Sequence, residues 1–475
     1  MRIAAFARIP GLIWLPISII GLLACLALTF PHRPHGSAGT QEIPYNVLLL
    51  VADDLGNELG FLGDKNARTP NLDALSEQMV VFTNAYATTS SCSPSRSSLY
   101  TGLYPHSTGQ LGLAPGFAMQ NTMRTLQEMC QGTGYATGYM GKVHVEPKEK
   151  MLAVDLVRTG LGFTRDFDRI AMYMDRFINH TDTVNQPWMV AINVYDPHRD
   201  KREFLPVVNG LPEHPVTASQ MEALPFQGVD TEEQRREIAG YYNSVTRLDA
   251  GIGMLFEVLR NRGQLDRTIV VITSDHGPPF ARGKTSLYEA GTKVPLMIYH
   301  PDGAIMPHHN PALVSLVDVL PTLLESMGQP LPEIPLHGKS LLPLLYQQQK
   351  EVREAVVTEF TYHADNAYYP RRAIRQGNYK LIVNVDTTLA FPFYMVDGDR
   401  AWHIVKEEGP NVPEHVQQAF DRYVNPPHYE LYDLGTDAWE FVNLATQPGQ
   451  QARIQEMLNS LQGWQQATGD TLRLN

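Results

Sequence analysis

The segment Tyr45–Asp54 reads YNVLLLVADD, a run of apolar residues that ends in two adjacent aspartates. A nearly continuous apolar run is typical of a strand covered on both faces, as in a parallel sheet. Open α/β sheets bind ligands beyond the carboxyl ends of their strands, so Asp53 and Asp54 are expected to face a ligand. Neighbouring carboxylates repel each other unless a cation lies between them. The segment therefore predicts a buried strand leading into a cation site, with a solvated turn as the alternative.

A second apolar run ends in the same way. Residues 268–277 read TIVVITSDHG, which places Asp275 and His276 directly after the run. Two strand ends with ligand-type residues predict a divalent metal site formed by Asp53, Asp54, Asp275 and His276. Oxygen ligands suit Ca²⁺, which we expect first, or Mg²⁺. His276 is less suited to Ca²⁺ and leaves Mg²⁺, Mn²⁺ or an indirect role open.

Strands and helices alternate along most of the chain. Further strands are expected at 136–140 and 187–195, and helices at 69–79 and 231–261. This alternation predicts an α/β fold with a large, mixed but mostly parallel sheet between layers of helices. After about residue 346, short strand-like runs and a final helix indicate a smaller α+β domain; they lie at 354–359, 373–375, 379–385 and 451–464. We expect three parts: 1–43 as a targeting segment and tether, 44–350 as the catalytic domain, and 351–475 as the C-terminal subdomain.

The composition bounds the function. The chain has 475 residues, of which 43% are hydrophobic and 19% charged, as in a globular protein. Its net charge of −12 argues against a nucleic-acid partner, so an anionic ligand must be attracted by a local basic pocket. Three cysteines, Cys25, Cys92 and Cys130, exclude a disulfide scaffold and leave Cys92–Cys130 as the one possible disulfide of the body.

The N-terminal segment is expected to target the chain to a membrane. Arg2 and Arg8 flank residues 11–30, which carry no charge. A basic flank before an apolar run is the pattern of an export signal, and this length also spans a bilayer as a helix. A cleaved signal peptide and a retained anchor are equal alternatives. The body is therefore expected outside the cytoplasm, in the periplasm, the extracellular space or a lumen.

The stretch Ser90–Arg96, SSCSPSR, precedes an expected helix at 95–103. It places the Cys92 thiol near a helix N-terminus and near the charge of Arg96, which is a setting for a reactive cysteine. The alternative is a buried free cysteine, for which a run so rich in serine and proline is a poor place. Cys92 is therefore a candidate nucleophile.

The C-x-P-S-R pattern at Cys92–Arg96, continued by Ser97–Gly102, resembles the signature of the sulfatase family. The other family blocks follow in the same order, and the resemblance covers about residues 44–464; the blocks are Val51–Gly56, Gly141–His144, Asp196–Arg199, Ser274–Gly277, and Leu431–Asp433 with Asn443 and Leu444. The resemblance implies an alkaline-phosphatase-like fold, a homodimer, and a maturation enzyme that oxidises Cys92 to formylglycine.

Within this family the chain is most similar to the heparan N-sulfatase branch, the sulfamidases. Asp196–Arg199, Pro279–Tyr288 and His363–Arg372 carry this similarity. It implies a sulfated saccharide as substrate, first of all N-sulfoglucosamine of heparan-type glycans. Two residues depart from the branch: His276 replaces an asparagine, and Lys284 replaces an arginine, which keeps the charge but loses the bidentate fork.

The resemblance also implies roles for the site residues. The hydrated formylglycine at Cys92 would attack sulfur, with Arg96 stabilising the hydrate. Lys142 and Lys284 would neutralise the sulfuryl oxygens, with Arg282 as the alternative to Lys284. His198 would be the general acid, and His144 would take the proton that releases sulfate. A candidate sugar-recognition loop supplies four further residues, although an ordinary exposed loop is the alternative; they are His363, Asp365, Arg371 and Arg372.

Three other functions stay open on these residues. One is an O-sulfatase that acts on another sulfated polysaccharide. Another is a phosphodiester or phosphonate monoester hydrolase of the same superfold, which His276 keeps possible. The third is a membrane-tethered glycan-binding protein without catalysis, which a retained Cys92 argues against, because a binder needs no nucleophile.

Overall fold

The computed structural model describes residues 44–161, 165–365, 367–389 and 398–474. The residues from Pro44 on form one compact unit. The expected targeting segment 1–43 lies outside the described residues. Within them, no helix has the length and apolar character needed to cross a bilayer.

The larger of two sheets has eight strands in the order β4-β3-β5-β1-β6-β7-β2-β8. Strand β7 runs antiparallel to both of its neighbours, and every other adjacent pair is parallel. The predicted mixed, mostly parallel sheet is therefore confirmed. In sheet order the strands are β4 (Leu156–Arg158), β3 (Ala136–Gly141), β5 (Trp188–Pro197), β1 (Asn46–Asp53), β6 (Thr268–Ser274), β7 (Lys293–Tyr299), β2 (Val80–Tyr86) and β8 (His308–Ser315).

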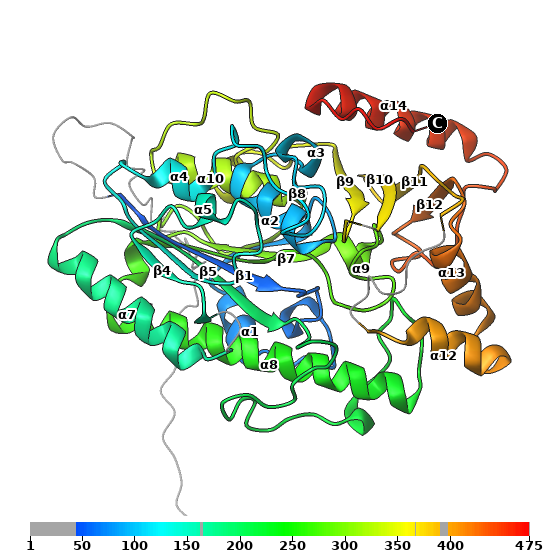
Figure 1. Ribbon diagram of the computed structural model, residues 1–475, viewed down its shortest axis with the longest axis horizontal. Coiled ribbons are helices and arrows are strands. Elements are labelled where there is room, and N and C mark those ends of the chain that lie inside the picture. The colour runs from blue at the N-terminus through cyan, green and yellow to red at the C-terminus, as the bar shows by residue number, and fades with distance from the viewer. Residues whose placement is uncertain (1–43, 162–164, 366, 390–397, 475) are drawn as a thin grey trace, which may run out of the picture. The chain divides into compact units, whose positions relative to one another are not determined.

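Helices cover both faces of this sheet (Figure 1). One face packs against α1 (Pro70–Ser76), α7 (Phe167–Thr183) and α8 (Glu232–Asn261). The other packs against α2 (Cys92–Thr101), α4 (Leu126–Cys130) and α10 (Val319–Ser326). Strand β1 is apolar throughout because its alternate side chains pack into two cores on opposite faces of the sheet. Leu48 and Leu50 pack on one face, and Leu49 and Val51 pack on the other. Four shorter helices are α3 (Pro105–Thr108), α5 (Lys148–Met151), α9 (Glu289–Thr292) and α11 (Leu342–Leu345).

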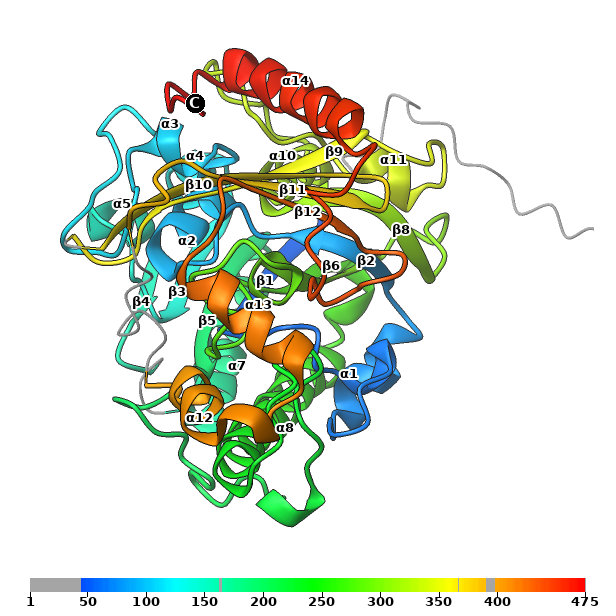
Figure 2. The same ribbon diagram turned by 90° about the vertical axis from the view of Figure 1, so that its right-hand side faces the viewer.

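The smaller sheet is antiparallel, in the order β12-β11-β10-β9. Figure 2 shows it between the final helix α14 (Gln451–Thr468) and helix α13 (Glu414–Val424), with α12 (Ala401–Glu408) beside α13. This confirms the smaller C-terminal α+β part. Its strands are β9 (Ala355–Tyr362), β10 (Tyr368–Gln376), β11 (Tyr379–Asn384) and β12 (Tyr429–Asp433).

His106, on α3, ties the larger sheet's helices to the C-terminal elements. Its Nδ1 lies 2.6 Å from a Glu359 oxygen and its Nε2 lies 3.2 Å from the Thr468 carbonyl. Both partners are acceptors, so the protonated ring makes both hydrogen bonds. Burial lowers the pKa of His106, but the Glu359 carboxylate more than offsets this and holds it above the ordinary value. The protonated ring is therefore the form that the fold stabilises.

A pH dependence of stability follows from this contact. Because the folded-state pKa is raised, the stabilisation is complete below the ordinary pKa of His106 and is lost as pH rises through the raised value. We expect His106→Gln to lower the free energy of unfolding by about 1 kcal/mol in acid and by less in base. Thermal melting of both proteins against pH measures the difference. The exposed His180, replaced by glutamine, serves as control, and a loss that grows with rising pH contradicts the assignment.

Candidate active site

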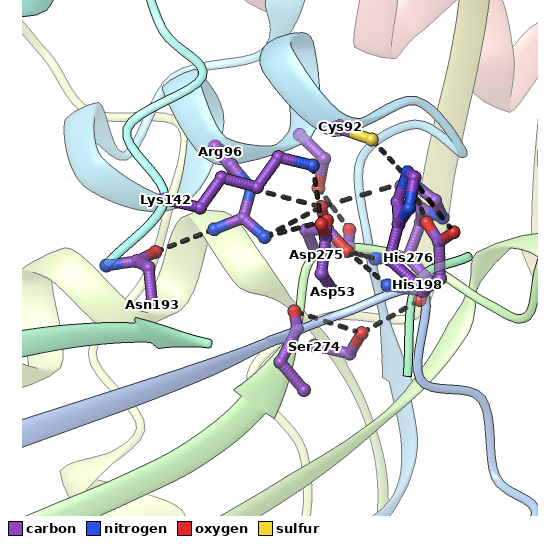
Figure 3. A network of polar contacts seen from close by, with 12 residues as sticks. Asp53, Cys92, Arg96, Lys142, Asn193, His198, Ser274, Asp275 and His276 are labelled. Carbon is purple, nitrogen blue, oxygen red and sulfur yellow. Dashed lines mark hydrogen bonds and ion pairs between the residues drawn. The ribbon is translucent and has the colours of Figure 1, made fainter. Parts of the chain in front are cut away.

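Four neighbouring parallel strands deliver polar residues at one edge of the larger sheet. In the order β3, β5, β1 and β6, Lys142 follows the first strand, Asn193 lies near the end of the second, Asp53 ends the third, and Asp275 follows the fourth. Figure 3 shows Lys142 and Asp275 close to Asp53, with Asn193 linked to them through Arg96. As expected, the ends of β1 and β6 lie next to each other in the sheet. The order of the strands therefore positions the cluster of Lys142, Asn193, Asp53 and Asp275.

Helix α2 brings Cys92 and Arg96 to the same point. The helix begins at Cys92, three residues earlier than expected, and all ten of its residues are buried. The hydroxyl of Ser95 donates to the carbonyl of Asp275, which holds the first turn against the strand end. Such contacts explain why serines fill this turn, since small hydroxyls allow close approach and satisfy backbone groups. Cys92 and Cys130 are both free, so the possible disulfide between them does not form.

Arg96 links three of the strand ends. Its Nη2 lies 3.0 Å from one oxygen of Asp53 and 3.0 Å from one of Asp275. Its Nη1 donates to the Asn193 side-chain oxygen at 2.6 Å. Lys142 Nζ lies 2.5 Å from the other Asp53 oxygen. Burial raises the pKa of Asp53, but Lys142 and Arg96 more than offset this and hold it well below its usual value.

Asp54 belongs to the same cluster, but nearby positive charges offset less of the cost of burying its carboxylate. Lys284 Nζ lies 3.1 Å from its carboxylate and His276 Nε2 lies 3.3 Å away. Burial nevertheless raises the pKa of Asp54 to about 6, against the opposing charges of His198 and Lys284. Its backbone lies in the left-handed region at φ 65°, a strained conformation that the surrounding contacts must hold.

The donor set fits a divalent cation. His276 Nδ1–H donates to the Gly277 carbonyl at 2.9 Å, which leaves Nε2 as the ring nitrogen that faces the cluster. Ligand atoms of Asp54, Cys92 and His276, and likewise of Asp53, Cys92 and Asp275, lie within 4.8 Å of one another. Burial lowers the pKa of His276, but the nearby negative charges raise it to about 10, so a cation would take the place of a proton there.

The net charge of the cluster indicates that an anionic group binds together with the cation. Three buried carboxylates face three buried cationic side chains, so these six groups together are neutral. Adding a divalent cation leaves an excess of positive charge, which an anionic group of a substrate would neutralise. The six are Asp53, Asp54, Asp275, Arg96, Lys142 and Lys284.

A cavity of about 350 Å³ opens beside Lys142. His198 and His144 line it, together with Tyr195, whose ring lies 5.1 Å from Lys142 Nζ. His198 Nδ1–H donates to the Arg199 carbonyl at 2.6 Å, and its Nε2 lies 3.4 Å from Lys284 Nζ. Burial lowers the pKa of His198 to about 4 and that of His144 to about 3. Both rings are therefore neutral at neutral pH in this arrangement.

Lys284 rather than Arg282 reaches the cluster. The Arg282 guanidinium is buried and donates to backbone carbonyls of Phe226, Trp439 and Glu440. Lys284 instead contacts Asp54 and His198. The geometry thus separates two residues that the sequence left as alternatives.

The four residues of the expected sugar-recognition loop are not brought together. His363 lies near Cys92, because its Nδ1 is 2.9 Å from the hydroxyl of Ser91. Asp365 is exposed, and Arg371 is buried on β10. Arg372 points to the opposite face of the small sheet, where it binds Asp470 at 2.8 and 2.9 Å. The substrate-binding roles of all four stay predictions, with least geometric support for Arg372.

The sequence analysis did not predict which residues hold the loop that carries His198. Asp196 accepts two hydrogen bonds from Arg247 at 2.7 Å and one from Arg165 at 2.8 Å. Arg165 also donates to the His198 carbonyl at 2.8 Å. Asn193 was missed as well, although a polar residue inside the apolar run MVAINVY was a usable signal.

Gly277 directly follows His276, and a side chain does not fit there. An added Cβ would lie 1.8 Å from the Ala290 carbonyl of α9. We expect Gly277→Ala to displace Asp275 and His276 and to lower kcat/KM by about 100-fold. Sulfate-release kinetics and melting temperatures measure this. Gly303→Ala is the matched control, because no atom lies within 4 Å of its added Cβ; equal activity of the two variants contradicts the prediction.

Comparison with known proteins identifies the family. Residues 45–329 match the sulfatase family, and residues 281–408 match a family described as N-sulphoglucosamine sulphohydrolase, C-terminal. The N-sulphoglucosamine sulphohydrolase of Homo sapiens is 32% identical over 468 residues, covering 90% of this chain and 91% of that protein. An ulvan-active sulfatase of Formosa agariphila is 29% identical and covers 92% and 83%.

Solved structures share the fold. A protein in complex with its substrate D-glucosamine-2-N,6-O-disulfate aligns with a TM-score of 0.68 at 19% identity, covering 90% of this chain and 99% of that one. The phosphonate monoester hydrolase of Agrobacterium radiobacter aligns with a TM-score of 0.64 at 20% identity, covering 89% and 96%. These likenesses show the fold alone. The family match over more than half of the chain, together with the human relative, shows that this chain belongs to the sulfatase family and is a sulfate-releasing hydrolase.

Proposed function

We propose that the chain hydrolyses the sulfamate of N-sulfoglucosamine in heparan-type glycans, with Cys92 converted to formylglycine. The observation that carries the proposal is the place of Cys92. Its sulfur lies at the first residue of α2, 3.3 Å from His276 Nε2 and beside the buried carboxylates. The human N-sulphoglucosamine sulphohydrolase supports the choice of substrate.

Two groups that the chain does not encode directly complete the site. Asp53, Asp54, Asp275 and His276 would hold a divalent cation, Ca²⁺ first and Mg²⁺ or Mn²⁺ as alternatives, which polarises a sulfuryl oxygen when bound. A maturation enzyme would supply the formylglycine, whose hydrate is a stronger nucleophile than a hydroxyl in water.

The remaining side chains would stabilise negative charge and transfer protons. Arg96 holds Asp53 and Asp275 in place at the start of α2. Lys142 and Lys284 stand on either side of the cluster, where they would neutralise the sulfuryl oxygens. His198 Nε2 accepts from Lys284 Nζ, so His198 would receive a proton there and then donate it to the departing amine. His144, which lines the same cavity, would take the proton that releases sulfate.

The proposal extends to the location and assembly of the protein. Residues 1–43 would export the chain, as a cleaved signal or as an anchor. The catalytic body would then act in the periplasm, the extracellular space or a lumen, as a homodimer. Fractionation of the native host, followed by N-terminal sequencing, separates the cleaved from the anchored form.

Specific observations also favour two other activities. An O-sulfatase is favoured by the ulvan-active relative and by Lys284 in place of arginine. A phosphonate monoester or phosphodiester hydrolase is favoured by His276 and by the shared fold with the Agrobacterium radiobacter enzyme.

A substrate panel tests the proposal. The matured protein is assayed on N-sulfoglucosamine, O-sulfated glucosamines, a phosphonate monoester and a phosphodiester. We expect kcat/KM to be highest for N-sulfoglucosamine. A higher value for an O-sulfated sugar or for a phosphorus ester would replace the proposed substrate by that class.

A further inference from the structure

Two of the three guanidinium nitrogens of Arg371, a buried residue on β10, have no hydrogen-bond partner among the described residues. Only 3% of its surface is exposed, and its Nε and Nη2 donate no hydrogen bond. Among the residues that the structure describes, no carboxylate pairs with it. Leaving such donors unpaired in the interior destabilises a fold, and more so when the group is charged. The position therefore needs an explanation.

Other deeply buried arginines of the chain bind acceptors. Arg96 binds Asp53 and Asp275, Arg247 binds Asp196, and Arg372 binds Asp470. Arg282 donates to four backbone carbonyls. Arg199 also has one unpaired nitrogen, Nε, but its Nη1 binds Glu237, whereas Arg371 has no side-chain acceptor among the described residues.

Aromatic rings hold the Arg371 guanidinium in a fixed orientation. Its central carbon lies 4.0 Å from the centroid of the Tyr369 ring and 5.8 Å from that of Phe360. Stacking on the Tyr369 ring covers one face of the guanidinium and leaves its edge, which carries the unpaired donors, oriented for an oxyanion. The arrangement resembles a recognition group more than a packing residue.

Arg371 also lies on the side of the small sheet that faces the catalytic residues. Ala373, on the same face of β10, packs in one hydrophobic cluster with Tyr288 and Tyr423. Tyr423 contacts Thr285, the neighbour of Lys284. The Thr285 amide donates to the Ser90 carbonyl at 2.8 Å, two residues before Cys92. A short series of contacts therefore connects Arg371 with the nucleophile.

We propose that Arg371 binds a second anionic group of the substrate, a sulfate or a carboxylate, beside the sulfate that is released. This inference rests on the proposed function, because it assigns a specificity residue to the same saccharide site. An oxyanion would accept two parallel hydrogen bonds from the guanidinium edge, a geometry that arginine provides and lysine does not. The expected substrates are therefore N-sulfoglucosamine units that carry a second negative charge, on the same sugar or on a neighbouring one.

A binding measurement tests the inference without cleavage. Cys92→Ala protein is titrated by calorimetry with three ligands: N-sulfoglucosamine, glucosamine 2-N,6-O-disulfate, and a disaccharide of N-sulfoglucosamine and a uronic acid. We expect at least one doubly charged ligand to bind about 10- to 100-fold more tightly than N-sulfoglucosamine. The added Arg371→Met substitution should remove this preference and leave the affinity for N-sulfoglucosamine unchanged. Which ligand loses affinity identifies the second anion as a sulfate or a carboxylate.

Two further variants keep the test decisive. Arg371→Lys keeps the charge but loses the fork, so it should lose part of the preference even if Arg371→Met fails to fold. Arg453 is the matched control, because it also stacks on a tyrosine, 3.6 Å from the centroid of Tyr379, but belongs to α14 on the other face of the small sheet. Arg453→Met should keep the full preference.

Three outcomes overturn the inference: no preference for a second anion with Arg371 intact, an equal loss for all ligands, or the same loss in Arg453→Met. Absence of sulfate release from matured protein, with the binding preference intact, would overturn the proposed function alone.

Discussion

Cys92→Ala is expected to lower sulfate release by about five orders of magnitude, because the variant has no side chain that can become the nucleophile. The fold should survive, since Cys92 is a small buried residue whose sulfur makes one polar contact, with His276. Sulfate-release kinetics on matured protein, paired with thermal melting, measure the two effects separately. The expected result is a folded protein with no measurable turnover.

Cys130→Ala is the matched control for this experiment. Cys130 is buried on α4 in the core, and burial raises the pKa of its thiol to about 12. Its replacement should cost some stability but leave kcat unchanged. If Cys92→Ala retains turnover similar to Cys130→Ala, Cys92 is not the nucleophile.

Arg96→Met has the second largest expected effect, on both activity and stability. It would leave Asp53 and Asp275 without the guanidinium that lies 3.0 Å from each. Removing one partner from a buried ion pair lowers the free energy of unfolding by about 3–5 kcal/mol. Loss of a preorganised charge at the reacting centre should also lower kcat by about three orders of magnitude. Denaturant unfolding and kinetics measure the two quantities.

Arg353→Met separates these two effects. Arg353 forms a buried ion pair with Asp318, outside the catalytic cluster. Its loss should destabilise the fold to a similar degree, yet the folded protein should keep its kcat. A comparable fall of kcat in both variants would mean that the Arg96 effect reflects stability and not catalysis.

The sequence predicts those parts of the site that lie at strand ends. The apolar run before Asp53 and the run before Asp275 mark buried parallel strands, and neighbouring strands of that kind end at one edge. The positions of Asp53 and Asp275 follow from periodicity and sheet geometry. Lys142 and His198 were instead singled out through the resemblance to the sulfatase family, and the structure places them directly after β3 and β5.

Residues that depend on tertiary partners were less predictable. β10 begins at Tyr368, five residues before the expected strand. The difference arises because Pro370, Arg371 and Arg372 give this buried segment the sequence pattern of a polar loop. Asp470, far along the chain, makes the burial of Arg372 possible. Thr69 is the N-cap residue of α1, but its hydroxyl donates to Asp73 and does not cap the helix. Local pattern does not encode such long-range partners.

Mass spectrometry of the peptide that contains residue 92, from protein made in its native host, tests the proposed mechanism most directly. Conversion of the Cys92 thiol to formylglycine lowers the peptide mass by about 18 Da, whereas ordinary thiol oxidation adds mass. The proposed mechanism predicts this loss in protein that releases sulfate. An unmodified Cys92 in fully active protein would contradict it.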